Sequence, residues 1–124
     1  HLVKPLGFDM DDAKLRRAGL DYHDLAHVKV HDSLDEALAD VPGHVWALTG
    51  HATTMYSDVS YADGDGLLFG RESVGLSEDA MRHPRVEDRV RIQMVDGVRS
   101  LNLANSASIV LYEAWRQLGF PNGV

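Results

Sequence analysis

Short apolar segments alternate with helical segments along this chain, and the alternation limits the fold more than any other feature. The candidate strands are VWALT (45–49), LLF (67–69) and VRIQMV (90–95), preceded by the strand-like alternation HVKVH (27–31). Helices that alternate with strands connect parallel strands and cover the faces of the sheet. The sequence therefore predicts an α/β fold with a mostly parallel sheet and helices on both faces.

Local signals place two of the shorter helices and one loop. Ser33, with Glu36 three residues later, is a capping box that opens the helix SLDEALADV (33–41). Ser77 is expected to cap a brief helix over residues 76–81. The segment 50–64 is polar and has no clear period. It is expected to cross the surface as a mobile loop.

The last helix has the clearest period. Its apolar residues keep the i, i+3, i+4, i+7 spacing that predicts one buried face: Leu103, Ala104, Ala107, Val110, Leu111, Ala114, Trp115 and Leu118. Gly119 and Pro121 are expected to end the helix. Ile109 and Tyr112 lie off that face, and a helix that is apolar on a second side is often covered by another element or another subunit. A homodimer contact through this helix is one of the two possibilities.

Length and composition exclude several classes of protein. The 124 residues suffice for one domain, and the absence of cysteine excludes disulfides, thiolate metal ligands and cysteine nucleophiles. No apolar run approaches the ~20 residues of a membrane span, so a cytoplasmic protein without a membrane partner is expected. The net charge of −7 argues mildly against nucleic acid, although phosphate contacts need only a local patch. Four arginines follow one another along one segment and are most simply solvated surface charges: Arg85, Arg89, Arg91 and Arg99.

Familiar catalytic and metal motifs are missing. His23, His27 and His31 are spaced four apart, but the second pair falls in a strand-like alternation, where this spacing does not bring two imidazoles together. No metal site is therefore expected. The string GRESVG (70–75) fits neither the GxSxG turn of serine hydrolases nor the phosphate-binding GxxxxGK[ST] loop.

Two loops near the C-terminus remain as candidates for a ligand pocket. Gly70 and Gly75 permit close backbone approach, and Ile92 and Met94 flank a slot on the strand that follows. Unpaired N–H groups at the start of the last helix favour an anion, and polar side chains gather there: Ser100, Asn102 and Asn105. These features indicate either a pocket for a nucleotide-like ligand or ordinary turn glycines and a helix cap.

The same segments carry a family resemblance. LFGRESVGL (68–76) and IQMVDGVRSLNLANSASIVLYEAWRQLGF (92–120) resemble the second and third motifs of the SPOUT methyltransferases. Within that superfamily, they and the upstream PLGFDMDDAKLRRAGLDYH (5–23) are most similar to the bacterial enzymes that methylate the ribose 2′-hydroxyl of the tRNA wobble nucleotide, cytidine or uridine 34. The resemblance extends to the end of the chain.

The resemblance implies a fold, a cofactor and partners. The fold would be an α/β domain with a C-terminal trefoil knot, and the protein would be a homodimer that places its last helix at the interface and the tRNA anticodon loop across both subunits. S-adenosylmethionine would bind in the knot, against Leu48, Gly70, Ile92 and Ser100. Further cofactor-pocket residues would lie nearby: Glu72, Gly75, Met94, Leu101 and Asn105.

The resemblance also implies how RNA is bound and methylated. Tyr112 matches a family tyrosine near the reacting groups, although an interface aromatic is an equal alternative, and Arg16 and Arg17 are candidates for binding RNA phosphate. The family begins with a strand and an NTGNxxR-like motif whose arginine assists the 2′-hydroxyl. Those residues would precede His1. We therefore expect residues 1–124 to be one methyltransferase domain that is truncated at its N-terminus; whether this truncated chain is active or inactive by itself stays open.

Two residues differ from the family pattern at the cofactor loops. Arg71 and Gln93 replace prolines of the family pattern and should loosen the cofactor loops. Two other functions compete with the methyltransferase interpretation. One rival is a non-catalytic RNA-binding or dimerisation module with the knotted fold. The other is a small-molecule-binding α/β domain without an RNA role.

Overall fold

The computed structural model describes residues 2–3, 29–70, 75–94 and 102–124, which belong to two compact units, 1–40 and 41–124. Several predicted site residues lie outside the described residues: Arg16, Arg17, Glu72, Ser100 and Leu101. His23 and His27 lie outside them as well. The two units are described separately below.

The first unit contains a parallel strand pair and one short helix. Strand β1 (Leu2–Val3) pairs with β2 (Val30–His31), and helix α2 (Leu34–Ala39) follows. The Ser33 hydroxyl accepts a hydrogen bond from the Glu36 amide at 3.2 Å, which confirms the predicted cap. Ala37 and Leu38 of α2 are buried.

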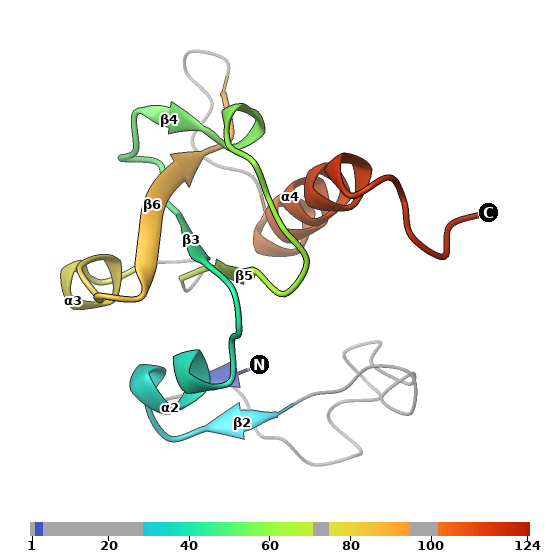
Figure 1. The fold of residues 1–124 in the computed structure, drawn as a ribbon. Helices are drawn as coiled ribbons and strands as arrows, with labels where there is room; N and C mark the ends of the chain where they lie inside the picture. Colours follow the sequence, from blue (N-terminus) through green and yellow to red (C-terminus); the bar gives the residue numbers. More distant parts are fainter. Residues whose placement is uncertain (1, 4–28, 71–74, 95–101) are drawn as a thin grey trace, which may run out of the picture. The chain divides into compact units, whose positions relative to one another are not determined.

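The second unit is built on a four-stranded sheet in the order β4-β6-β3-β5. Its strands are β3 (Val45–Leu48), β4 (Thr54–Met55), β5 (Gly66–Leu68) and β6 (Val86–Arg91). Every pairing between them is parallel, and β6 lies between β3 and β4 (Figure 1). The prediction of a mostly parallel α/β sheet with helices is confirmed.

Strand β6 corrects the predicted strand at 90–95, because it runs from Val86 to Arg91 and leaves Ile92 and Met94 beyond its end. The sequence pattern failed here because Glu87 and Asp88 are charged. Both side chains are exposed, and their backbone belongs to the ladder that β6 forms with β3. Pairing with the neighbouring strands therefore determines where β6 begins and ends, and the content of apolar residues does not.

The segment 50–64 is also different from its prediction. It contains β4 and the 3₁₀ helix η1 (Tyr56–Asp58), and it buries Ala52 and Tyr61 to 7% and 6% exposure. The expectation of a surface excursion was wrong, since Tyr61 belongs to the hydrophobic core. The buried side chains are irregularly spaced, so no periodic pattern revealed them.

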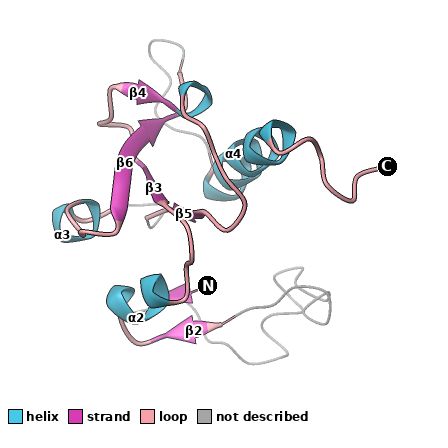
Figure 2. Ribbon diagram, in the orientation of Figure 1, coloured by secondary structure: helices cyan, strands magenta, loops and turns pink. Residues whose placement is uncertain are grey.

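Helix α4 (Leu103–Gln117) covers one face of this sheet, and the short helix α3 (Glu78–Met81) precedes β6 (Figure 2). The core cluster joins Val110 of α4 to side chains of the sheet and of the segment before β5: Trp46, Tyr61 and Val90. Ser77 caps α3, as predicted, by accepting a hydrogen bond from the Ala80 amide at 3.1 Å. Gly119, with φ of 84°, follows the end of α4, as predicted.

The rotation of α4 about its axis corrects the predicted apolar face. Leu111 is 60% exposed and Leu118 39%, whereas Val110 is fully buried and Gln117 is partly buried. The Gln117 amide explains the difference, because it donates to the Val59 carbonyl at 2.9 Å and accepts from the Tyr61 amide at 2.9 Å. The hydrogen bonds of Gln117 thus fix which side of α4 faces the sheet, and the spacing of apolar residues alone predicted a different side.

Candidate functional site

The carboxyl ends of three parallel strands meet at one edge of the sheet in the second unit. Leu48, the last residue of β3, pairs with Val90 of β6, and Ala47 pairs with Leu68 of β5. Gly70 and Ile92 each follow their strands by two residues or fewer. The register therefore brings three predicted cofactor residues, Leu48, Gly70 and Ile92, to the same edge, which is where open parallel sheets bind ligands.

The loop after β5 requires glycine at Gly70. A Cβ on Gly70 would fall well inside contact distance of the Gly75 carbonyl carbon and the Leu76 nitrogen, both of them backbone atoms that cannot swing aside. Gly75 has φ of 70°, and a Cβ there would meet nothing within 4 Å. The two glycines thus bring two stretches of backbone together beside open space, as the predicted close approach requires.

The start of α4 is capped by its own chain. The Asn102 side-chain oxygen accepts hydrogen bonds from the amides of Ala104 at 2.8 Å and Asn105 at 3.3 Å. For Asn102 the helix-cap alternative is therefore confirmed, and two of the amides that were considered for an anion are already paired. The Asn105 residue itself is exposed.

Tyr112 lies farther along the same helix. It is 62% exposed and makes an edge-to-face contact with Trp115 at 5.6 Å between ring centroids. Seven residues of helix, about 10 Å, separate it from Asn105. Trp115 in turn contacts Phe120 at 4.9 Å, so the exposed end of α4 carries an aromatic cluster.

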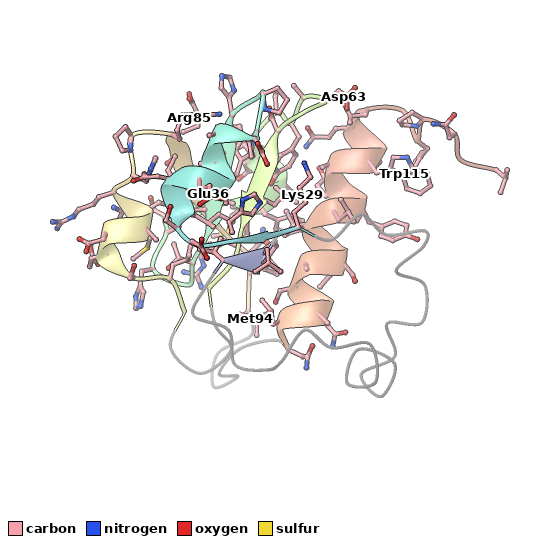
Figure 3. The ribbon with its side chains drawn as sticks, turned by 90° about the horizontal axis from the view of Figure 1, so that it is seen from below. Lys29, Glu36, Asp63, Arg85, Met94 and Trp115 are labelled. Atoms are coloured by element: carbon pink, nitrogen blue, oxygen red, sulfur yellow. The ribbon has the colours of Figure 1, made fainter. Side chains whose placement is uncertain are left out.

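The opposite, amino edge of this sheet is held by a partly buried carboxylate and an arginine whose roles the sequence did not reveal. Asp65 accepts hydrogen bonds from the His44 amide at 2.9 Å, the Ala62 amide at 2.9 Å and the Trp46 indole at 3.0 Å. Arg85 donates to the carbonyl oxygens of Val41 and Gly43 at 2.6 and 2.9 Å. Figure 3 shows Arg85 and Asp63 at one end of the unit and Met94 at the other.

Hydrogen bonding also sets the protonation of these groups. Burial raises the pKa of the Asp65 carboxyl, but hydrogen bonds from Trp46, Ala62 and His44 outweigh it and hold this pKa below its ordinary value. On α4, hydrogen bonds from Arg116 and Gln117 lower the pKa of Glu113 to about 2. Both carboxylates are therefore ionised at neutral pH and serve as acceptors.

A further feature that the sequence did not predict is the burial of Arg91, the last residue of β6. Its Nε is buried and has no hydrogen-bond partner among the described residues. The sequence offered only its place in a row of arginines, which favoured a solvated charge. The structure instead shows a partly buried guanidinium.

The described residues contain neither a cluster of metal ligands nor a membrane-spanning helix. Within residues 2–3, 29–70, 75–94 and 102–124, no three histidine, aspartate or glutamate side chains gather closely enough to hold a metal ion. Among these residues, no helix has the length and apolar character needed to cross a bilayer.

Comparisons with known proteins give this geometry a context. The model of the SpoU rRNA methylase family matches residues 1–112. The chain is 47% identical to the tRNA (cytidine(34)-2′-O)-methyltransferase of Escherichia coli strain K12, over 100% of this chain and 80% of that protein.

Solved structures agree with the sequence comparison. A structure described as giving insights into the 2-OH methylation of C/U34 on tRNA matches with a TM-score of 0.85 and 40% identity, over 96% of this chain and 78% of that chain. The SpoU methyltransferase AviRb of Streptomyces viridochromogenes, solved in complex with the cofactor AdoMet, shares the fold with a TM-score of 0.77 and 24% identity. That match covers 94% of this chain and 48% of the AviRb chain.

Proposed function

The chain belongs to the SpoU rRNA methylase family, and we propose that it methylates the ribose 2′-hydroxyl of the wobble nucleotide, cytidine or uridine 34, of tRNA. The methyltransferase family expected from the two loop motifs is thereby confirmed. The observation that carries the specific function is the 47% identity, over the whole chain, to an enzyme named for cytidine 34. A tRNA substrate fits a cytoplasmic protein.

The proposed cofactor is S-adenosylmethionine, which supplies an electrophilic methyl group when bound. Leu48, Gly70, Ile92 and Ser100 would hold it, and five further residues would line the pocket: Glu72, Gly75, Met94, Leu101 and Asn105. The fit is supported by the common edge that Leu48, Gly70 and Ile92 share, and by the close backbone approach that only glycine permits at Gly70. The trefoil knot of the family is part of the same proposal.

The protein's contribution to the chemistry would be alignment and removal of a proton. The ribose oxygen forms the new bond to the methyl carbon as the carbon–sulfur bond breaks, and the hydroxyl proton leaves to a base or to water. Among the described residues, Tyr112 is the candidate for a side chain that lies near the reacting groups. Arg16 and Arg17 would bind phosphates around the anticodon loop. Exposure of the Tyr112 ring leaves its hydroxyl accessible for either a catalytic or an interface role.

A homodimer through α4 is the proposed assembly. Leu111 and Tyr112 are 60% and 62% exposed on this helix, and Phe120 is 46% exposed just beyond its end. Contiguous exposed apolar side chains of this size are typical of protein interfaces. The interface would therefore lie on the side of α4 that faces away from the Val110 core.

The function can be tested by methyl transfer from labelled S-adenosylmethionine to tRNA by the full-length protein, including the expected N-terminal arginine motif, followed by nucleotide mapping. We expect the label on the ribose of nucleotide 34, and no transfer to a matched tRNA with 2′-deoxyribose at that position. Label at another nucleotide would contradict the proposed specificity. Binding of tRNA and cofactor without any transfer would instead support the non-catalytic RNA-binding or dimerisation module.

A further inference from the structure

The two faces of β6 carry different chemistry. Successive side chains of a strand point to opposite faces, and paired residues of neighbouring strands share a face. Val90 is buried in the α4-side core, and its partner Leu48 packs there as well. Arg91 pairs with Met55 and therefore lies on the other face, as does Arg89, two residues earlier.

Arg91 is incompletely satisfied on that face. Its Nε is buried without an acceptor among the described residues, although the residue as a whole is only partly buried. A buried donor without an acceptor costs about 1–3 kcal/mol, and more when the group is charged. Native proteins rarely keep such a group unless a ligand or another molecule completes it.

The chemistry of the missing acceptor can be read from the donor. A guanidinium presents N–H groups in a planar fork that matches two oxygens of a phosphate or carboxylate. Leu48 and Ile92 pack on the α4 side, so the cofactor they are proposed to hold lies on the face away from Arg91. The cofactor carboxylate is therefore the poorer candidate.

The surroundings favour a polyanion. Arg89 and Arg91 share a face and lie about 7 Å apart along the strand, which suits a chain of phosphates better than a single carboxylate. Glu87 lies farther toward the amino edge, at the irregularity in the pairing of β6 with β3, and is within 4.0 Å of the His44 Nε2. The positive charge thus increases toward the edge where β6 ends.

We propose that Arg91 binds a phosphodiester group of the RNA substrate through its guanidinium, beside the carboxyl edge of the sheet. This inference rests on the proposed RNA methylation and adds to it a phosphate contact on the face of the sheet away from the cofactor residues. It makes Arg91 a substrate-binding residue and not a participant in methyl transfer.

The test is tRNA binding by the Arg91→Gln and Arg91→Lys variants at several salt concentrations. We expect Arg91→Gln to weaken tRNA binding by about tenfold or more and to reduce the slope of log affinity against log salt by about 1. Arg91→Lys should keep the salt slope but recover only part of the affinity, because it keeps the charge and loses the fork. Cofactor affinity, measured by calorimetry, should change less than about twofold in both variants, since the proposed cofactor residues lie on the other face of the sheet from Arg91.

A matched control is Arg82→Gln, which removes the same charge from α3. Arg82 is exposed and its Nε lies 3.5 Å from the Glu78 carboxylate, so tRNA affinity should stay within about twofold. Equal tRNA affinity of Arg91→Gln and the unaltered protein would overturn the inference. Weakened cofactor binding by Arg91→Gln would also overturn it, in favour of the carboxylate. Absence of tRNA binding by the unaltered protein would instead overturn the proposed function.

Discussion

The amino and carboxyl edges of the four-stranded sheet are held together by different means. At the amino edge, the Asp65 carboxylate and the Arg85 guanidinium connect five backbone or side-chain groups of neighbouring segments. At the carboxyl edge, the described contacts are mostly backbone, such as the Thr49 amide on the Val90 carbonyl at 3.0 Å and the glycine approach after β5. The Arg91 Nε there has no acceptor in the part of the chain that the structure describes.

The difference between the two edges suggests that the amino edge stabilises the fold and that the carboxyl edge binds the ligand. Side chains that already satisfy one another, as at the amino edge, stabilise the strands but offer a ligand few free groups. Backbone in close approach, and a guanidinium Nε without an acceptor among the described residues, offer more, at some cost in stability. Substitutions at the amino edge should therefore change unfolding, and substitutions at the carboxyl edge should change binding.

The largest effect is expected from Asp65→Ala. It leaves the Trp46 indole and two backbone amides without their acceptor, and we expect a loss of about 3 kcal/mol in the free energy of unfolding. Cofactor affinity of the folded variant should stay within about twofold. Urea unfolding and calorimetry measure the two quantities.

Asp63→Ala is the matched control for that experiment. Asp63 is exposed in the same turn, and its loss should change stability by about 0.5 kcal/mol or less. A large loss of cofactor affinity in Asp65→Ala, with little loss of stability, would contradict the division between the two edges.

Gly70→Ala should have the next largest effect, and on binding. The added Cβ collides with the backbone of Gly75 and Leu76, so this backbone must shift. Overpacking of this kind typically costs about 1–3 kcal/mol. We expect cofactor binding to weaken roughly 10- to 100-fold in calorimetry. Gly50→Ala is the control, since a Cβ there meets nothing within 4 Å. Wild-type affinity in Gly70→Ala would remove Gly70 from the site.

Asn102→Ala tests whether the N-terminal cap of α4 contributes to the stability of the fold or to cofactor binding. Its oxygen pairs with the Ala104 and Asn105 amides, and loss of such a cap costs about 1 kcal/mol. Urea unfolding should show this loss, while Ser108→Ala on the exposed part of the helix should be nearly neutral. A much larger effect on cofactor affinity than on unfolding would place Asn102 in the binding site.

The smallest effect is a pH dependence at the amino edge. Because the folded-state pKa of Asp65 lies below its ordinary value of 3.8, its contribution is present above that value and is lost as pH falls through the lowered pKa. The stability difference between the unaltered protein and Asp65→Asn should shrink on acidification by about 1 kcal/mol or less, since solvent screens a partly exposed group. A difference that grows toward low pH would contradict this assignment.

Local sequence signals predicted the elements that depend on a few neighbouring residues. Ser33, Ser77 and Asn102 cap helices because each hydroxyl or amide needs only the amide two or three residues later. The parallel sheet followed from the alternation of strands and helices. The position of the candidate site at the strand ends followed from the two glycine-containing and polar loops.

The remaining features depend on residues far apart in the sequence. Strand β6 starts at Val86 because β3 pairs with it, and α4 has its rotation because Gln117 hydrogen-bonds to residues 59 and 61. The role of Asp65 has no local sequence signal, because it depends on the indole of Trp46, 19 residues away. Leu48 entered the predicted site by resemblance alone, and its role there stays a prediction.

The strand order also determines the sequence of events in folding. β6 begins at Val86, long after β4 ends at Met55, yet it lies between β4 and β3 in the finished sheet. β3 and β5 can pair once the loop between them closes, whereas β6 is the strand that pairs with β4 among the described residues. Pairing over such sequence separations is slow. We therefore expect the strand that carries Arg91 to join the sheet after β3 and β5 have paired, so that the binding edge forms after the frame that supports it.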